Sequence, residues 1–297
     1  MKLIIFALAW LPHLALAMNL SFPTKEVAAR VLTTPDAYLN SLSENDLALR
    51  AGSGVSKQAY LDLVAAQTLD WTESERHQIT SIVQEIEREL SSHGIALNVP
   101  SVVFIKTTGR EESSAAYTRS NFIVLPEMRL RADLSALVAH ELFHVYSRHR
   151  HDLRDLLYAT AGFTRVMPLP RELETVRYKV LSNPDVDDLG WAIRLQSRGE
   201  SFLAIPLILR REPFRHIPGP GFLFRELDFK LLRLGNGTLF SPGETDYISA
   251  IGANSDYNIH PEEIVAENFS FLATGKTSGV PRPDAIESLR RVLQSAR

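Results

Sequence analysis

The pattern of apolar and polar positions predicts helices and strands in mixed order along the chain. The clearest helix lies between Thr72 and Gly94, where apolar residues recur three and four positions apart. Thr72 and Glu75 fit a capping box at its start, and Gly94 is placed to end it. The same periodicity predicts further helices at 25–32, 58–69, 171–181, 261–275 and 283–296.

Runs of β-branched and aromatic residues predict the strands. They lie at 101–108, 115–126, 190–198, 201–209 and 222–234, and a polar loop is expected at 234–247. Strands and helices do not alternate regularly, as they would in a doubly wound sheet. We therefore expect an α+β fold.

Composition excludes several functions. The 297 residues contain 32 lysines and arginines against 35 aspartates and glutamates, a net charge of −3, so no basic excess is present to bind nucleic acid. The chain has no cysteine, which excludes disulfides, cysteine nucleophiles and cysteine metal ligands.

The first 17 residues have the layout of a signal peptide. Met1 and Lys2 precede the apolar run LIIFALAWLPHLALA, which ends in the pattern Ala-Leu-Ala at residues 15–17. This run is shorter than the roughly 20 apolar residues that a spanning helix needs. We expect a secreted or periplasmic protein that begins near Met18 and has no stable membrane insertion after removal of the signal.

The segment LVAHELFHVYSRHRH (137–151) carries the main chemical signal. His140, Glu141 and His144 match the pattern H-E-x-x-H within an expected helix that starts near Ala132 or Asp133. Residues four apart share a helix face, so both imidazoles point toward one place, where they suit Zn²⁺. Glu141 lies one step round, placed to take a proton from a water on the metal.

A third ligand is not found within the same helix. His149 faces another direction and His151 lies about 10 Å further along the axis. The metzincin pattern would need glycine and histidine where Ser147 and Arg150 stand. The histidines and arginines of 148–154 are therefore expected to form a solvated basic helix end.

The segment HPEEIVAENF begins an expected helix at Pro261 in which Glu263 and Glu267 share a face. Together with H-E-x-x-H, this resembles the gluzincin group of zinc metallopeptidases, in which a glutamate on a later helix completes the site. The resemblance implies that Glu263 is the third ligand and that Glu267 orients a ligand histidine. Glu262 is the alternative ligand if the helix register differs.

The resemblance also implies how substrate is bound. The strand before the site helix would pair with an extended peptide. The candidates for polarising the substrate carbonyl are Tyr247, Tyr257 and His260, of which Tyr257 and His260 are preferred. The segment NPDVDD (183–188) lacks the glycine and glutamate of a calcium loop, and we expect a polar turn there.

These observations favour a zinc-dependent hydrolase, a metallopeptidase that acts on peptides or proteins. The expected organisation is a signal peptide at 1–17 and one zincin-like domain at 18–297, in which a small mixed sheet precedes the H-E-x-x-H helix. That domain has an N-terminal helical region (18–95) and a mixed α/β insert (about 165–245) before the third-ligand helix. The alternative is a zincin-like protein that binds a cell-envelope partner, with a structural metal or none.

Overall fold

The computed structural model describes residues 18–131 and 133–296. Its helices and two β-sheets confirm the α+β class. The expected signal peptide at 1–17 lies outside the described residues. Within the described part of the chain, no helix combines the length and the apolar character needed to cross a membrane.

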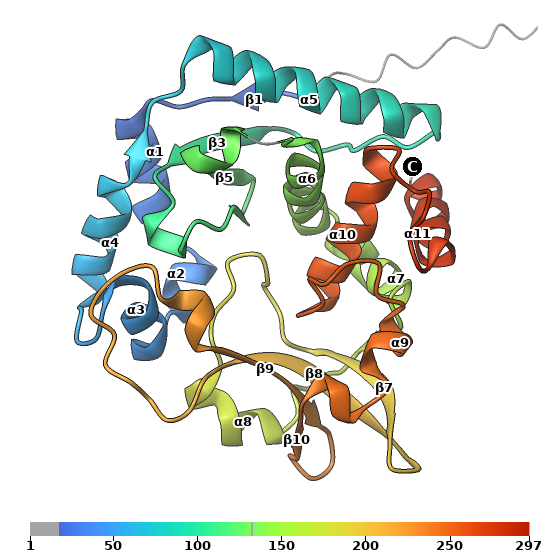
Figure 1. The fold of residues 1–297 in the computed structure, drawn as a ribbon. Coiled ribbons are helices and arrows are strands. Elements are labelled where there is room, and N and C mark those ends of the chain that lie inside the picture. Colours follow the sequence, from blue (N-terminus) through green and yellow to red (C-terminus); the bar gives the residue numbers. More distant parts are fainter. Residues whose placement is uncertain (1–17, 132, 297) are drawn as a thin grey trace, which may run out of the picture.

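The helices and strands are arranged around one central region (Figure 1). The α-helices of the described residues are α1 (Lys25–Thr33), α2 (Ala37–Ser41), α3 (Glu44–Ala51), α4 (Lys57–Ala66), α5 (Glu73–Ser92), α6 (Ser135–His149), α7 (Arg154–Ala159), α8 (Glu172–Val176), α9 (Tyr247–Ile251), α10 (Pro261–Ala273) and α11 (Pro283–Ser295). The strands are β1 (Leu20–Ser21), β2 (Thr68–Leu69), β3 (Val102–Thr107), β4 (Tyr117–Arg119), β5 (Phe122–Pro126), β6 (Phe163–Arg165), β7 (Trp191–Ser197), β8 (Glu200–Arg210), β9 (Leu227–Arg233) and β10 (Leu239–Phe240).

The first sheet is mixed and is covered on both faces. Its strand order is β1-β3-β5-β4, with β2 also pairing to β3, and β4 forms one edge. Side chains alternate along a strand, so Phe104 and Ile123 enter the core shared with α5 and α6. Their neighbours Ile105 and Val124 pack against α1 to α4 on the other face.

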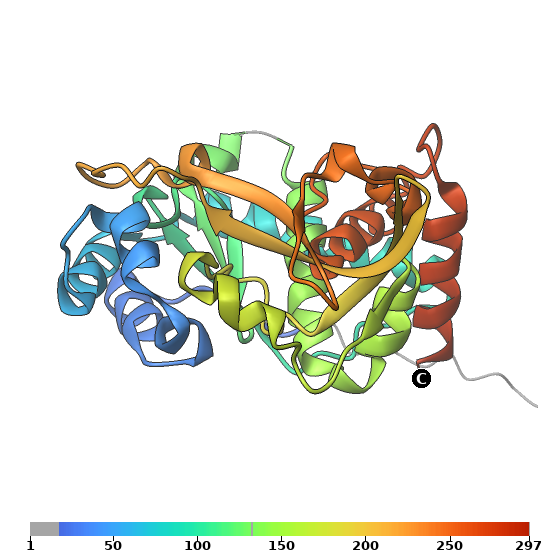
Figure 2. The same ribbon diagram turned by 90° about the horizontal axis from the view of Figure 1, so that it is seen from below.

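The second sheet is antiparallel, in the order β10-β9-β8-β7-β6. One face contributes Trp191, Ile193 and other residues to the main core, and the opposite face packs on α8. Viewed from below, the long strands β8 and β9 cross the molecule toward the N-terminal helices (Figure 2). This sheet lies within the segment predicted as an insert, and it places a second wall opposite the first sheet.

Helices α6 and α10 pack along each other between the two sheets. Phe143 of α6 and Phe269 of α10 are in contact, with ring centroids 5.6 Å apart. Both rings are fully buried, so this contact is part of the main core. This contact sets the separation of α6 and α10, which are more than 100 residues apart in the chain.

Several sequence predictions differ from the structure. The helix predicted at 58–69 ends at Ala66 and is followed by β2, and the strand predicted at 222–234 begins at Leu227, after a 3₁₀ turn at Leu223–Glu226. The strand predicted at 115–126 is a hairpin, because Ser120 turns the chain with a φ of 52° between β4 and β5. The helix predicted at 171–181 is limited to α8 and a 3₁₀ turn, Arg177–Lys179. The loop predicted at 234–247 contains the short strand β10, which pairs with β9.

A buried ion-pair network joins the N-terminal helices to the rest of the molecule. The Arg50 guanidinium donates to Glu112 Oε1 at 2.7 Å and pairs with Asp46 Oδ1 at 3.1 Å. It also donates to the backbone carbonyl of Ser182 at 2.8 Å. All three charged side chains are at most 3% exposed, so each depends on its partners for stabilisation.

We predict that Arg50→Ala lowers the free energy of unfolding by about 3–5 kcal/mol, because two carboxylates lose a buried partner. Urea unfolding followed by circular dichroism measures this loss. Arg290→Ala is the control, since Arg290 forms an i,i+3 pair on the surface of α11. Equal unfolding midpoints for the two variants would contradict the assigned role of Arg50.

Candidate metal centre

Helix α6 presents His140 and His144 on one buried face, as their spacing requires. Their rings lie 4.7 Å apart between centroids and are nearly perpendicular. The two residues are 7% and 0% exposed, and Glu141 between them is 2% exposed. Buried polar groups require partners, so the surroundings of these side chains determine what the site can do.

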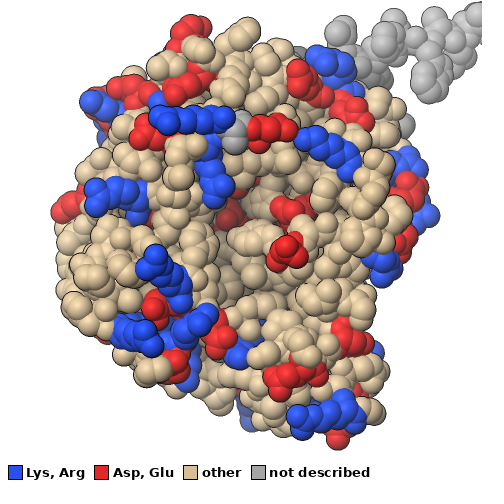
Figure 3. Space-filling model, in the orientation of Figure 1, with Lys and Arg blue, Asp and Glu red and all other residues tan. Residues whose placement is uncertain are grey.

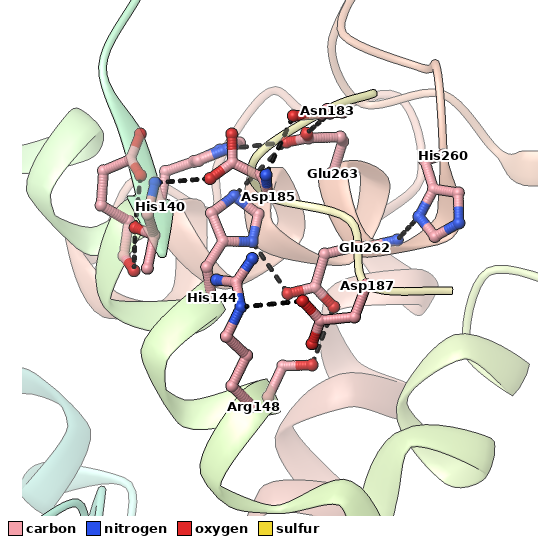
Figure 4. Close-up of polar contacts among 12 residues, drawn as sticks. His140, His144, Arg148, Asn183, Asp185, Asp187, His260, Glu262 and Glu263 are labelled. Carbon is pink, nitrogen blue, oxygen red and sulfur yellow. Dashed lines mark hydrogen bonds and ion pairs between the residues drawn. The ribbon is translucent and has the colours of Figure 1, made fainter. Parts of the chain in front are cut away.

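Helix α10 brings Glu263 to the two histidines (Figure 4). Glu263 Oε2 lies 3.1 Å from His140 Nε2 and 3.4 Å from His144 Nε2. The three ligand atoms lie within 4.8 Å of one another, a spacing that a single divalent cation spans after small adjustments. The structure therefore places Glu263 where the resemblance expected the third ligand.

The second nitrogen of each histidine is held by a carboxylate of α10. His140 Nδ1 contacts Glu267 Oε1 at 2.9 Å, the contact that was expected of Glu267. His144 Nδ1 contacts Glu262 Oε1 at 2.8 Å. Each carboxylate fixes the tautomer with hydrogen on Nδ1 and leaves Nε2 free to bind a metal.

Glu262, which the sequence offered as the alternative third ligand, is placed elsewhere. Its Oε2 accepts hydrogen bonds from Ser147 Oγ at 2.8 Å and from the hydroxyl of Tyr158. Both carboxylate oxygens are engaged away from the point where the Nε2 atoms converge. Glu262 orients His144 and does not belong to the three-residue ligand group.

The contacts fit a cation at the convergence point. His144 Nε2 is buried and has no hydrogen-bond partner among the described residues. With hydrogen on Nδ1 of both rings, two nitrogen lone pairs face the Glu263 carboxylate, an arrangement that repels unless a proton or a metal ion lies between them. Two imidazoles and one carboxylate form the donor set of many catalytic zinc sites.

Protons stabilise the same cluster when no metal is bound. Burial lowers the pKa of His140, but its contacts with Glu263 and Glu267 outweigh burial and raise the pKa to about 10. Burial likewise opposes ionisation of Glu263, and the charges of His144 and His140 lower its pKa below the usual range. A metal ion at this site would therefore compete with protons.

Glu141 is held beside the edge strand of the first sheet. Its Oε2 accepts a hydrogen bond of 2.6 Å from Thr118 Oγ1 on β4. Thr118 thus connects the predicted substrate-binding strand to the predicted general base. The interaction fixes the direction of the Glu141 carboxylate.

The segment 183–188, here called the strap, was predicted to be a polar turn and is instead part of the site (Figure 4). Asn183 Nδ2 donates to Glu263 Oε1 at 2.7 Å, which directs the other oxygen toward the histidines. Asp185 is 7% exposed, and its Oδ1 accepts a hydrogen bond from the backbone N–H of Thr118 at 2.6 Å. Nothing in the local sequence distinguished these two residues from a solvated turn.

The prediction of a solvated basic helix end at 148–154 is only partly correct. His149 and His151 are exposed, as expected. Arg148 and Arg154, however, are at most 9% exposed and form ion pairs with Asp187 of the strap at 3.3 and 2.8 Å. These arginines anchor the strap to the end of the site helix.

The three residues proposed to polarise substrate have different surroundings. Tyr257 lies beside the site, with its ring centroid 6.0 Å from that of His140. Tyr257 is 40% exposed, so this residue is accessible from solvent. Tyr247 is fully buried and donates to the backbone carbonyl of Asn258.

His260 caps helix α10 and does not point to the candidate metal ligands (Figure 4). Its Nδ1 accepts from the backbone N–H of Glu262 at 3.1 Å, and its Nε2 donates to the carbonyl of Asp188 at 3.1 Å. Burial lowers its pKa to about 4, so the ring is neutral. The structure therefore assigns His260 a structural contact where a substrate contact was predicted.

No family model, curated protein or solved structure matches this chain. The interpretation of the site consequently depends on its own geometry.

We predict that zinc binding displaces protons from His140 and His144. Because both histidines hold protons at neutral pH in the metal-free protein, apparent zinc affinity should fall ~10- to 100-fold from pH 7 to pH 6. Isothermal titration calorimetry in buffers of different ionisation enthalpy measures the protons released. An affinity that is constant between pH 6 and pH 8 would contradict this competition.

Proposed function

We propose that the chain is a zinc-dependent hydrolase, a peptidase of zincin-like architecture. The observation that carries the proposal is the convergence of His140, His144 and Glu263 within 4.8 Å, with Glu141 beside them. The secreted or periplasmic location is part of the proposal and depends on the N-terminal sequence alone.

Three protein ligands support a catalytic site over a structural one. Structural zinc sites are closed by four protein ligands, whereas catalytic sites keep a position open for water. Among the described residues, the group that contains Glu263 has three members; a second group, Glu141, His144 and Asp185, shares His144 with it but includes neither His140 nor Glu263. The alternative, a cell-envelope binding protein with a structural metal, lacks this support.

Zinc bound at this site would supply Lewis acidity and lower the pKa of a water molecule. Glu141, directed by Thr118, accepts a proton from the attacking water and passes it to the departing nitrogen. The C–N bond breaks, and the water oxygen remains on the carbonyl carbon. Tyr257 lies beside His140, where its hydroxyl can donate to the carbonyl oxygen.

A peptide substrate is supported by the position of β4. This strand is at the edge of the first sheet and is adjacent to the catalytic helix through Thr118. Edge strands bind extended peptides through main-chain hydrogen bonds. In β4 the residues are buried and the Thr118 N–H already donates to Asp185 Oδ1, so a peptide would have to displace this contact. Peptide bonds are therefore the substrate class that the proposal favours.

We predict that Glu141→Gln retains zinc and lowers kcat for peptide hydrolysis by ~10²- to 10⁴-fold, the usual contribution of a general base. Zinc content by atomic emission and turnover of a peptide library measure the two effects separately. The change removes the base without removing a member of the ligand group.

Glu263→Gln is the matched variant, because it makes the same chemical change on a proposed ligand. It should lose zinc and activity together, whereas Glu141→Gln loses activity alone. A wild-type protein without stoichiometric zinc, or a Glu141→Gln variant with full peptidase activity, would reject the proposed function.

A further inference from the structure

The first described residues of the chain cover one edge of the first sheet. Strand β1 pairs in parallel with β3, and its Leu20 lies opposite Val102. Strand β2 pairs with the other end of β3, at Lys106 and Thr107. An unpaired strand edge can pair with another chain, so β1 and β2 together protect the outer edge of β3.

Side chains next to β1 anchor it to the main core. The ring of Phe22 stacks on that of Phe104, with centroids 5.6 Å apart, and meets Trp71 edge-on at 5.5 Å. Met18 and Leu20 are partly buried against the same core. Because β1 has only two residues and few backbone hydrogen bonds, contacts at its ends contribute to its position.

The contact at the beginning of this segment is made by the backbone nitrogen of Met18. This nitrogen lies 2.8 Å from Glu87 Oε1 of α5, a residue 69 positions away in the chain. Strand β1 runs alongside α5, as Figure 1 shows. The distance falls within the range of about 2.7–2.9 Å that is typical of a hydrogen bond from a charged nitrogen to a carboxylate.

Glu87 has no cationic side chain as a partner. It is partly buried, and among residues 18–131 and 133–296 no lysine, arginine or histidine pairs with it. Glu75, on the same helix, pairs instead with Lys106 at 2.7 Å. Acidic and basic side chains are interspersed along the upper edge of the molecule in Figure 3, where Figure 1 places α5. The contact with Met18 is therefore specific to Glu87 and does not reflect a broad acidic surface.

The nitrogen beside Glu87 is the one that removal of the expected signal peptide would release. The pattern Ala-Leu-Ala at residues 15–17, which lies outside the described residues, directly precedes Met18. Hydrolysis of the bond between residues 17 and 18 breaks the C–N bond, and the water oxygen stays on the carbonyl carbon of residue 17. The Met18 nitrogen becomes an α-ammonium group at neutral pH.

We infer that the chain is processed between residues 17 and 18, by a signal peptidase of the exporting cell, and that Glu87 binds the α-ammonium group of Met18. This inference rests on the exported location in the proposed function, and it does not depend on zinc or on hydrolytic activity. Processing replaces a neutral N–H donor with a charged one, and charged donors form hydrogen bonds about twice as strong. The new ion pair would hold β1 against the edge of β3.

The position of Glu87 favours a single start of the processed chain. Consecutive Cα atoms are about 3.8 Å apart, so a start one residue earlier or later would move the charge beyond hydrogen-bond reach of Glu87 Oε1. A start at Met18 places the charge on the atom that the contact already involves.

The first test identifies the start of the exported chain. The full sequence, including residues 1–17, is expressed in bacteria, and the exported protein is examined by intact mass spectrometry and N-terminal sequencing. We expect one species that begins at Met18. An exported chain with another start would overturn the inference and leave the exported location standing. A chain that keeps Met1 and stays in the cytoplasm would overturn both, whereas zinc content and peptidase activity of the same sample test the hydrolase separately.

The second test measures the ion pair by a thermodynamic cycle. Chains that begin at Met18, and chains with Gly-Ser before Met18, are each made with Glu87 and with Glu87→Gln. In the chain that begins at Met18 the substitution should lower Tm by ~1–3 °C, the size expected for a partly exposed pair. In the extended chain the loss should be less than half as large, because the nitrogen is an uncharged amide.

Glu85→Gln is the matched control, since Glu85 is exposed on the same helix. It should leave Tm unchanged in both chains. An equal Tm loss for Glu87→Gln in the two chains, or none in the chain that begins at Met18, would show that Glu87 does not bind the ammonium group and would overturn the inference.

Discussion

The packing of α10 against α6 is the constraint on which the candidate site depends. His140 and His144 are paired by their own helix, but Glu263 reaches them only because the two helices lie side by side, with Phe143 against Phe269. The same packing delivers two further carboxylates to the Nδ1 atoms. A small shift between the helices would therefore disturb the ligands and their orienting partners together.

Several ionisable side chains are buried together at the site. Burying charge without partners is energetically unfavourable, so these groups need an explanation. Glu262 and Glu263 are at most 1% exposed, and isolated carboxylates at such depth would protonate. Here each one faces a histidine, and Ser147 and Tyr158 satisfy the remaining oxygen of Glu262. Buried ion pairs are weak evidence of stabilisation, so the density of this cluster supports the cation site that we propose.

The sequence allowed us to predict those features of the site that depend on helical periodicity. The spacing of His140 and His144 defined one helix face, and residues 263 and 267 defined another. Consecutive residues differ by about 100° around a helix, so the distinct contacts of Glu262 and Glu263 follow from the helix register, which the sequence left open. The hairpin was missed because Ser120, with a φ of 52°, turns the chain without the glycine that marks most such turns.

The strap could not be predicted, for a reason that concerns the whole molecule. Its contacts come from four segments far apart in the chain: Thr118 on the first sheet, Arg148 on α6, Glu263 on α10, and Arg50, which reaches Ser182 immediately before it. A polar sequence such as NPDVDD acquires meaning only when these partners surround it. The N-terminal helices, the sheet edge, α6 and α10 therefore all meet at the strap, and the same contacts that join these parts into one fold hold Asn183 beside Glu263.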